Sequence, residues 1–227
     1  MLALSDPSTG VDRWYFDPPE EILQSCLFAR GGYRVVTGLF DEETLQALQA
    51  EADMMRARGV RGCVSDSDGT EGRGGAPGRA YRLVAGGELH WRLHGCQQMA
   101  ETLGRLCGAT VSSTGGGTYS YYEQAGDFLA LHRDVLQCDI AVITSLTHSI
   151  VDGSTGELAV YPDFIHEPLS TVRRAGRSSS TFVPLDRGQT AILLGGIVPH
   201  EVSPTCAGQD RVVAVNCYRV QSSDGRD

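Results

Sequence analysis

The chain has 227 residues, 41% of them hydrophobic, and this length and composition predict a single domain, residues 1–227, with a proper core. Its 19 basic and 28 acidic residues give a net charge of −9, which disfavours polyanions and argues against a nucleic-acid partner. The seven cysteines form no Cys-x-x-Cys pair, so neither a disulfide framework nor a zinc site is expected. The N-terminal sequence has no basic region and no long apolar run. Together with the cysteine pattern, it predicts a cytoplasmic protein with no membrane partner.

Residues 1–110 are predicted to form a mainly helical support region. Asp17, followed by two prolines and two glutamates, predicts a helix start, and Gly31-Gly32 predicts the end of that helix. The β-branched run Tyr33–Thr37 predicts a strand, after which Asp41 caps a second helix with a continuous apolar face. A third helix is predicted from Gln97 to Leu106.

The composition changes between Arg61 and Arg79. This stretch holds six glycines, several serines and charges, and hardly any apolar side chain that could anchor a core. Two interpretations stay open: a surface insertion, or a mobile lid over an active site. Tyr81–Val84 predicts a strand that leaves this segment.

The second half is predicted to be rich in β-strands. Short runs of strand-forming residues alternate with Gly, Pro, Asp and Ser, at a spacing that fits a double-sheet jelly roll. The candidate strands are Thr118–Glu123, Phe128–Leu131, Asp139–Leu146, Glu157–Tyr161, Ser180–Val183, Thr190–Leu194 and Arg211–Val220. Helices first and strands later favour an α+β fold, in which N-terminal helices flank a double-stranded β-helix (jelly-roll) core at residues 111–220.

Two metal-binding side chains lie close together in His132-Arg133-Asp134. Residues two apart on a strand point to the same face, so His132 and Asp134 could bind one ion together. The best candidate for a third ligand is His200. Two histidines and one carboxylate leave the other metal positions open, which suits a non-haem Fe(II) centre that activates O2.

A family resemblance rests on several motifs in one order. The stretch Tyr122–Asp134, with Gly126 and the His-x-Asp pair at their spacing, is followed by His200 and Arg211. This arrangement resembles the Fe(II)/2-oxoglutarate-dependent oxygenases, especially their prolyl-hydroxylase-like branch. Gly153–Val160 is also similar to the family's Gly-rich turn before a core strand.

The resemblance implies a set of site residues. His132, Asp134 and His200 would be the iron ligands, and Arg211 would bind the distal carboxylate of 2-oxoglutarate. Many family members have a Ser or Thr two residues after this Arg, where this chain has Val213. The candidates for a second partner of that carboxylate are Tyr122 and Ser145. Strand alternation independently places Arg211 among apolar neighbours, where a buried guanidinium needs an anion.

The resemblance also implies an enzyme that couples oxidative decarboxylation of 2-oxoglutarate by O2 to oxidation of a substrate C–H bond. Hydroxylation is the default outcome, and the carboxylate ligand Asp134 argues against halogenation. Size and charge favour a small polar metabolite, such as an amino acid or a natural-product intermediate, while the resemblance to prolyl hydroxylases favours a peptidyl substrate. The alternatives from other classes are a cupin-like metalloenzyme that does not use 2-oxoglutarate and a non-catalytic binding module. The oligomeric state is left open.

The remaining histidines and several aromatic residues receive weaker interpretations. His90, His94, His148 and His166 have no motif partners and are expected at the surface or in loops. On the strand before the motif, Tyr122 is expected to face inward and Tyr121 outward. Two roles stay open for Arg79, Tyr81 and Trp91: contact with the substrate, or a purely structural role.

Overall fold

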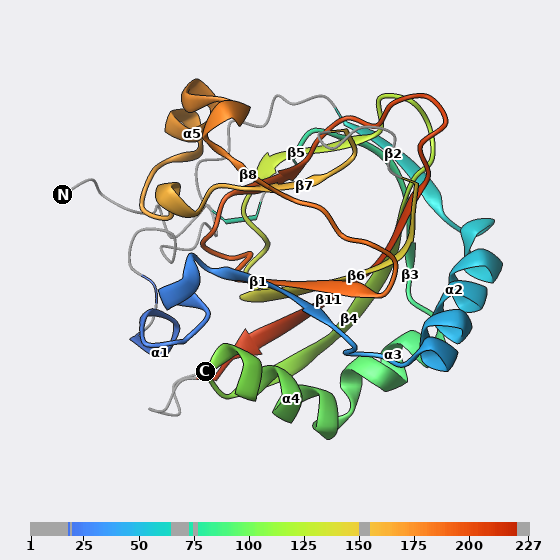
Figure 1. The fold of residues 1–227 in the computed structure, drawn as a ribbon, viewed down its shortest axis with the longest axis horizontal. Helices are drawn as coiled ribbons and strands as arrows, with labels where there is room; N and C mark the ends of the chain where they lie inside the picture. The colour runs from blue at the N-terminus through green and yellow to red at the C-terminus, as the bar shows by residue number, and fades with distance from the viewer. Residues whose placement is uncertain (1–17, 19, 65–72, 75–76, 150–154, 222–227) are drawn as a thin grey trace.

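The computed structural model describes residues 18, 20–64, 73–74, 77–149 and 155–221. Eleven strands in this part of the chain join one antiparallel sheet in the order β1-β9-β6-β11-β4-β3-β5-β10-β7-β8, and β2 pairs with β3. Because β3 pairs with β4 along one part of its length and with β5 along another, the sheet folds back on itself into a nearly closed barrel (Figure 1). The predicted α+β fold with a jelly-roll core is confirmed.

The strands are β1 (Tyr33–Thr37), β2 (Val60–Val64), β3 (Arg79–Ala85), β4 (Val111–Tyr122), β5 (Phe128–His132), β6 (Ile140–His148), β7 (Leu158–Val160), β8 (Thr181–Val183), β9 (Gln189–Leu193), β10 (His200–Val202) and β11 (Arg211–Val220). The helices are α1 (Glu20–Leu23), α2 (Glu42–Arg56), α3 (Glu88–Gly95), α4 (Gln97–Cys107) and α5 (Leu169–Ala175), with short 3-10 turns η1 (Phe28–Arg30), η2 (Pro162–Phe164) and η3 (Arg177–Ser179).

Strand β11 lies in the middle of the sheet, between β4 and β6. Its alternating side chains divide as expected: one set lines an internal cavity and the other packs against the outer layer. The cavity set is Arg211, Val213, Val215 and Cys217. The same strand therefore supplies core packing on one face and site residues on the other.

Helices α3 and α4 pack against β4 on the outer side of the sheet, and α2 lies beside α3 against β6 and β3 (Figure 1). Helix α2 begins at the predicted cap, where the Asp41 side chain accepts a hydrogen bond from Thr44 N at 2.8 Å. Helix α4 ends at Gly108, which has a φ of 76° that favours glycine. No helix among the described residues is long and apolar enough to cross a membrane.

The first predicted helix is shorter than expected. Only α1 and the turn η1 form before Gly31, because the Ser25 hydroxyl donates to Ile22 O at 2.7 Å and accepts from Phe28 N at 3.0 Å. These bonds compete with a continuous helix. The expected cap at Asp17 lies outside the described residues.

The segment between Arg61 and Arg79 is not one loop. Its first residues belong to β2, its last residue begins β3, and the Arg73 side chain between them is buried. Residues 65–72 and 75–76 lie outside the described part, so the lid stays a prediction. The division of the domain near residue 110 also stays a prediction; β1, β2 and β3 come from the N-terminal side and join the same sheet.

Four helices and strands were not predicted: α3, α5, β2 and β10. Helix α3 lacks a capping side chain of its own, and Glu51 of α2 accepts hydrogen bonds from Leu89 N and His90 N instead, at 2.8 and 3.0 Å. A cap supplied by another helix leaves no local signal in the sequence.

Although no disulfide framework was expected, one pair of cysteines is bonded. A disulfide joins Cys138 to Cys217, with a Cα–Cα distance of 4.8 Å. The two cysteines are separated by 79 residues and meet because β6 pairs with β11, where Cys217 lies opposite Ala141. Such a pair depends on strand register, so no short spacing could reveal it.

Candidate metal centre

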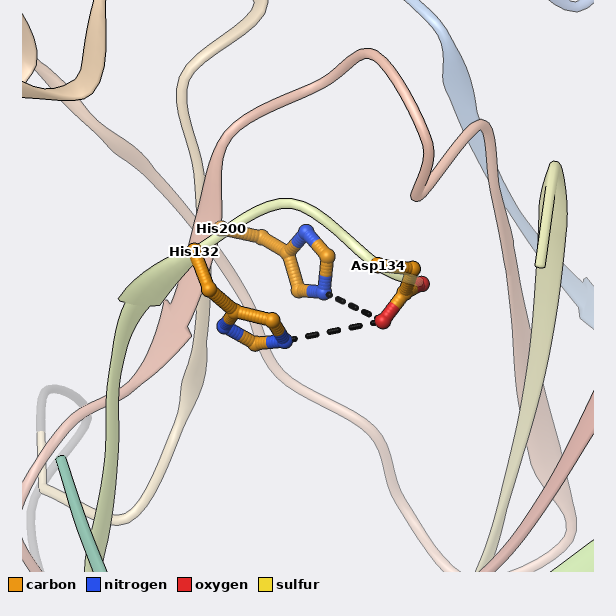
Figure 2. A group of neighbouring side chains, drawn as sticks. All are labelled: His132, Asp134 and His200. Carbon is orange, nitrogen blue, oxygen red and sulfur yellow. Dashed lines mark ion pairs between the residues drawn. The ribbon is translucent and has the colours of Figure 1, made fainter. Parts of the chain in front are cut away.

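Three side chains meet at one end of the barrel. His132 ends β5, His200 begins the neighbouring strand β10, and the two residues lie directly opposite each other in the sheet. Asp134 lies just beyond β5, so the expectation that it belongs to the strand is wrong, but its carboxylate still turns toward both rings (Figure 2). Asp134 Oδ1 is 3.5 Å from His132 Nε2 and 3.7 Å from His200 Nε2.

Backbone carbonyls fix the orientation of both imidazoles. Nδ1 of His132 lies 2.9 Å from Ala130 O, and Nδ1 of His200 lies 2.9 Å from Val198 O. A carbonyl can only accept, so each Nδ1 carries a proton, and in the neutral ring Nε2 then presents a lone pair to the carboxylate. Two lone pairs and an anion that face one another need a cation between them, and this is how histidine metal ligands are oriented.

The electrostatics favour the metal-binding protonation states. Burial lowers the pKa of His200 to about 4, with His132 adding to the effect, so the ring is neutral near pH 7. Burial raises the pKa of Asp134, but His200, His132 and Arg73 together hold it below its usual value. The centre therefore offers a neutral His200 ring and a carboxylate, with His132 Nε2 directed at the same carboxylate oxygen.

The chain around Asp134 is built to hold this carboxylate. A Cβ at Gly195 would fall 1.9 Å from Asp134 Oδ2, so only glycine leaves room there. The Arg73 guanidinium donates to Asp134 O at 3.2 Å, to Val135 O at 2.6 Å and to Cys138 O at 2.9 Å, and it pairs with Asp139 Oδ1 at 3.0 Å. One buried arginine thus fixes the turn that carries the candidate ligand Asp134.

Arg133 stabilises the same turn from the other side. Its Nε donates to Ile197 O at 2.8 Å, close to His200 in the chain. Its Nη2 donates to carbonyls at the end of η2 and just after it. The side chain is 1% exposed. The residue between the two expected ligands therefore holds the two ligand-bearing segments together.

The candidate metal-binding group, His132, Asp134 and His200, opens into a cavity of about 250 Å³. Arg211 lies in the same cavity and is only 2% exposed. Its guanidinium carbon is 5.1 Å from the centre of the Tyr122 ring, and Tyr122 also lines the cavity. Among the described residues, no carboxylate lies within ion-pair distance of Arg211. Burial lowers the pKa of this guanidinium, so the site has a costly buried cation that lacks a direct anionic partner.

Sequence reasoning missed a pair of buried residues next to Arg211. His148 lies opposite Arg211 in the sheet, and its Nε2 is 3.3 Å from Glu157 Oε1. Burial raises the pKa of Glu157 to about 7, although Arg211 opposes the shift. The strand pairing that brings His148 to Arg211 has no short-range signal.

The other predicted site residues divide between the two faces of the sheet. Tyr122 faces the cavity, whereas the Tyr121 hydroxyl donates to Ala52 O under α2 at 2.7 Å, as alternation predicted. Ser145 is fully buried on β6 opposite Val213, and its Oγ has no hydrogen-bond partner among the described residues. Its role toward a carboxylate stays a prediction.

The expected surface positions of three histidines are wrong. His90 and His94 are buried on α3 beneath β4 and β11, and the His148 side chain is buried on β6. Helical spacing on a face that packs against the sheet explains the first two. His166 is exposed, as predicted.

No protein-family model and no curated protein sequence matches this chain. Solved structures do match. HygX from Streptomyces hygroscopicus, determined with nickel and 2-oxoglutarate bound, superposes with a TM-score of 0.63 at 13% identity, over 92% of this chain and 94% of that one. The 2-oxoglutarate-dependent non-haem epimerase SnoN from nogalamycin biosynthesis gives a TM-score of 0.62 at 18% identity, over 95% and 84%.

A prolyl-4-hydroxylase from Pseudomonas putida is a third neighbour, with a TM-score of 0.59 at 15% identity, over 86% of this chain and 96% of that one. At these identities the likeness is one of fold. This chain has the double-stranded β-helix fold of the Fe(II)/2-oxoglutarate-dependent oxygenases, and the fold implied by the resemblance is confirmed.

Proposed function

We propose that this protein is a non-haem Fe(II)/2-oxoglutarate-dependent oxygenase that hydroxylates, or otherwise oxidises, a C–H bond of a small polar metabolite. The observation that carries the proposal is the convergence of His132, Asp134 and His200 in the cavity that also holds Arg211. Two structural neighbours support the same function: HygX, determined with nickel and 2-oxoglutarate bound, and SnoN, a 2-oxoglutarate-dependent non-haem epimerase.

The chain's own residues would hold the metal and the cosubstrate. Nε2 of His132, Nε2 of His200 and a carboxylate oxygen of Asp134 suit Fe(II), which keeps further positions open with such a set. When bound, iron, 2-oxoglutarate and O2 supply the chemistry: a substrate R–H becomes R–OH while 2-oxoglutarate becomes succinate and CO2.

The Arg211 guanidinium would bind the distal carboxylate of 2-oxoglutarate. Its planar set of donors matches a carboxylate, and a bound carboxylate would supply the anion that the buried cation lacks. Tyr122 would orient the guanidinium from beneath, and Ser145 stays the other candidate for contact with the same carboxylate. In a cupin-like metalloenzyme that does not use 2-oxoglutarate, Arg211 would be expected to form a structural ion pair. Among the described residues, Arg211 has no such pair.

A small substrate suits the cavity of about 250 Å³, which must also hold the cosubstrate. The prolyl-4-hydroxylase neighbour favours the alternative, a peptidyl substrate. Separate pools of small metabolites and peptides, tested for succinate formation above the background without substrate, distinguish the two. Stimulation by peptides alone would replace the small-molecule assignment.

The proposed reaction is tested by succinate formation in single variants of the metal-binding group. His132→Ala, Asp134→Ala and His200→Ala should each abolish 2-oxoglutarate-dependent succinate formation and leave the fold intact, since these side chains contribute little to core packing. His166→Ala, an exposed histidine, is the matched control and should keep full activity. Full activity in Asp134→Ala would refute the assignment.

A further inference from the structure

Two donor side chains on β3 face the cavity beside the metal-binding group. Arg79, Tyr81 and Leu83 alternate along the strand, and all three line the cavity. Arg82 points the other way and donates to Glu123 Oε1 at 2.8 Å on the outer face. Neither Arg79 nor Tyr81 belongs to the set assigned above to the metal or to 2-oxoglutarate.

Arg79 is the cavity arginine whose charge is still available. The Arg133 guanidinium donates its hydrogen bonds to backbone carbonyls, and Arg211 is proposed to bind the cosubstrate. Arg79 has no hydrogen-bond or ion-pair partner within the described ranges, and its side chain is only partly buried. Its Nε lies 3.4 Å from the position that a Cβ would take on Gly62, so the β2 backbone supports the arginine stem.

Tyr81 lies next to Arg79 on the same face. It is 8% exposed, and its ring stacks on Tyr122 with the centroids 4.9 Å apart. Burial raises the pKa of the Tyr81 phenol, Arg79 opposes the shift and Asp134 adds to it, so the neutral hydroxyl is within electrostatic reach of both charges. It has no hydrogen-bond partner in the described part of the chain and is available as a donor toward a ligand.

The rest of the cavity wall indicates what such a ligand would look like. Asp134 is the one carboxylate among the described cavity residues, and it already faces the two imidazoles. A ligand ammonium would therefore have no free anionic partner. The wall is otherwise largely apolar, and Leu83 and Val135 are 38% and 48% exposed, which places them at the cavity mouth.

We infer that the substrate of the proposed oxygenase is a small carboxylic acid with an apolar body and no free ammonium group, whose carboxylate is bound by Arg79 and Tyr81. This inference rests on the proposed function and narrows its substrate class. Free α-amino acids become poor candidates, whereas N-acylated amino acids and simple organic acids fit. The planar guanidinium and the adjacent phenol suit the two oxygens of a carboxylate.

The test is a series of binding measurements on the metal-loaded protein. Binding is measured by calorimetry, so the result does not depend on turnover. The acid probes are hexanoate, octanoate, phenylpropanoate and N-acetylnorleucine. The comparison compounds are the amides of the first three acids, the amines with an amino group in place of the carboxylate, hexyl phosphate and free norleucine. Acids and N-acetylnorleucine should bind, and Arg79→Gln should weaken them by about 10- to 150-fold, the range for a hydrogen bond to a charged group. Tyr81→Phe should weaken them less, and Arg82→Gln is the matched control on the opposite face of β3.

Each outcome separates this inference from the proposed function. A wild-type protein that shows the visible band of an Fe(II)–2-oxoglutarate complex, yet binds none of the acids or binds them equally after Arg79→Gln, overturns the substrate class alone. Preference for hexyl phosphate or for free norleucine overturns it as well. A wild-type protein without that band overturns the proposed function itself. Thermal unfolding of each variant identifies any loss of binding caused by misfolding.

Discussion

Replacing Arg211 tests its proposed role as the anchor of 2-oxoglutarate. The side chain is 2% exposed, lies over the Tyr122 ring and has no carboxylate within ion-pair distance among the described residues. Removing one partner of a buried, hydrogen-bonded charge pair costs about 2–5 kcal/mol of binding free energy. The 2-oxoglutarate concentration needed for half-maximal activity should therefore rise by roughly 30-fold to several thousand-fold in Arg211→Ala.

Two further variants separate charge from shape and from stability. Arg211→Lys keeps the charge without the planar set of donors, so its affinity for 2-oxoglutarate should lie between wild type and Arg211→Ala. Arg211→Met keeps much of the volume and removes the buried cation, whose pKa is lowered by burial. It should lose the cosubstrate yet unfold at an equal or higher urea concentration, because the desolvation cost of the charge disappears.

The assay is succinate formation as a function of 2-oxoglutarate, with the dissociation constant measured without O2 as a second readout. Arg219→Ala is the matched control, since Arg219 lies on the same strand with its side chain 53% exposed. An unchanged 2-oxoglutarate requirement in Arg211→Ala would refute the reasoning and assign the anchor to another residue.

Two other predictions concern buried residues around the site. The folded-state pKa of Glu157 is raised to about 7, so its contribution to stability is present below the unfolded pKa and is lost as the pH rises through the folded one. The buried histidines His90, His94 and His200 have lowered pKa values and gain stability over the same pH range, so the Glu157 effect is measured as a difference from Glu157→Gln. Between about pH 5 and pH 8 the unfolding free energy of wild type should fall by up to about 3 kcal/mol relative to Glu157→Gln, and parallel urea profiles would contradict this. Arg73→Lys loses several bonds to the turn that carries Asp134, so Fe(II) affinity should fall by about 10- to 100-fold in a metal titration. The exposed variant Arg105→Lys should match wild type, and equal affinity in a folded Arg73→Lys would exclude that role.

Local patterns in the sequence were sufficient to predict much of the fold. Alternation along Arg211–Val220 correctly separated the cavity face from the packing face, and the cap at Asp41 and the stop at Gly108 correctly bounded two helices. These features depend on neighbours a few residues away. Helix α3 was not predicted, because its capping residue, Glu51, belongs to another helix.

The supporting residues of the site could not be predicted in the same way. Arg73 lies in a glycine-rich segment that looked like a surface loop, and only the folded chain brings it to the carbonyls around Asp134. His148 lies beside Arg211 because β6 pairs with β11, and Glu157, which directly precedes β7, reaches His148 from another strand. The types and order of the candidate ligands can be predicted from short sequence motifs. The residues that position these ligands cannot, because their placement depends on the register between strands far apart in the sequence.

The most direct test of the proposed function is an anaerobic titration of the protein with Fe(II) and then 2-oxoglutarate. The account predicts a weak visible charge-transfer band that requires both additions, saturates at one equivalent of iron, and is absent in His132→Ala and His200→Ala. In Arg211→Ala the band should appear only at much higher 2-oxoglutarate concentration. A protein that binds the metal tightly but shows no band with 2-oxoglutarate, at any concentration, would contradict the account and favour a metalloenzyme that does not use this cosubstrate.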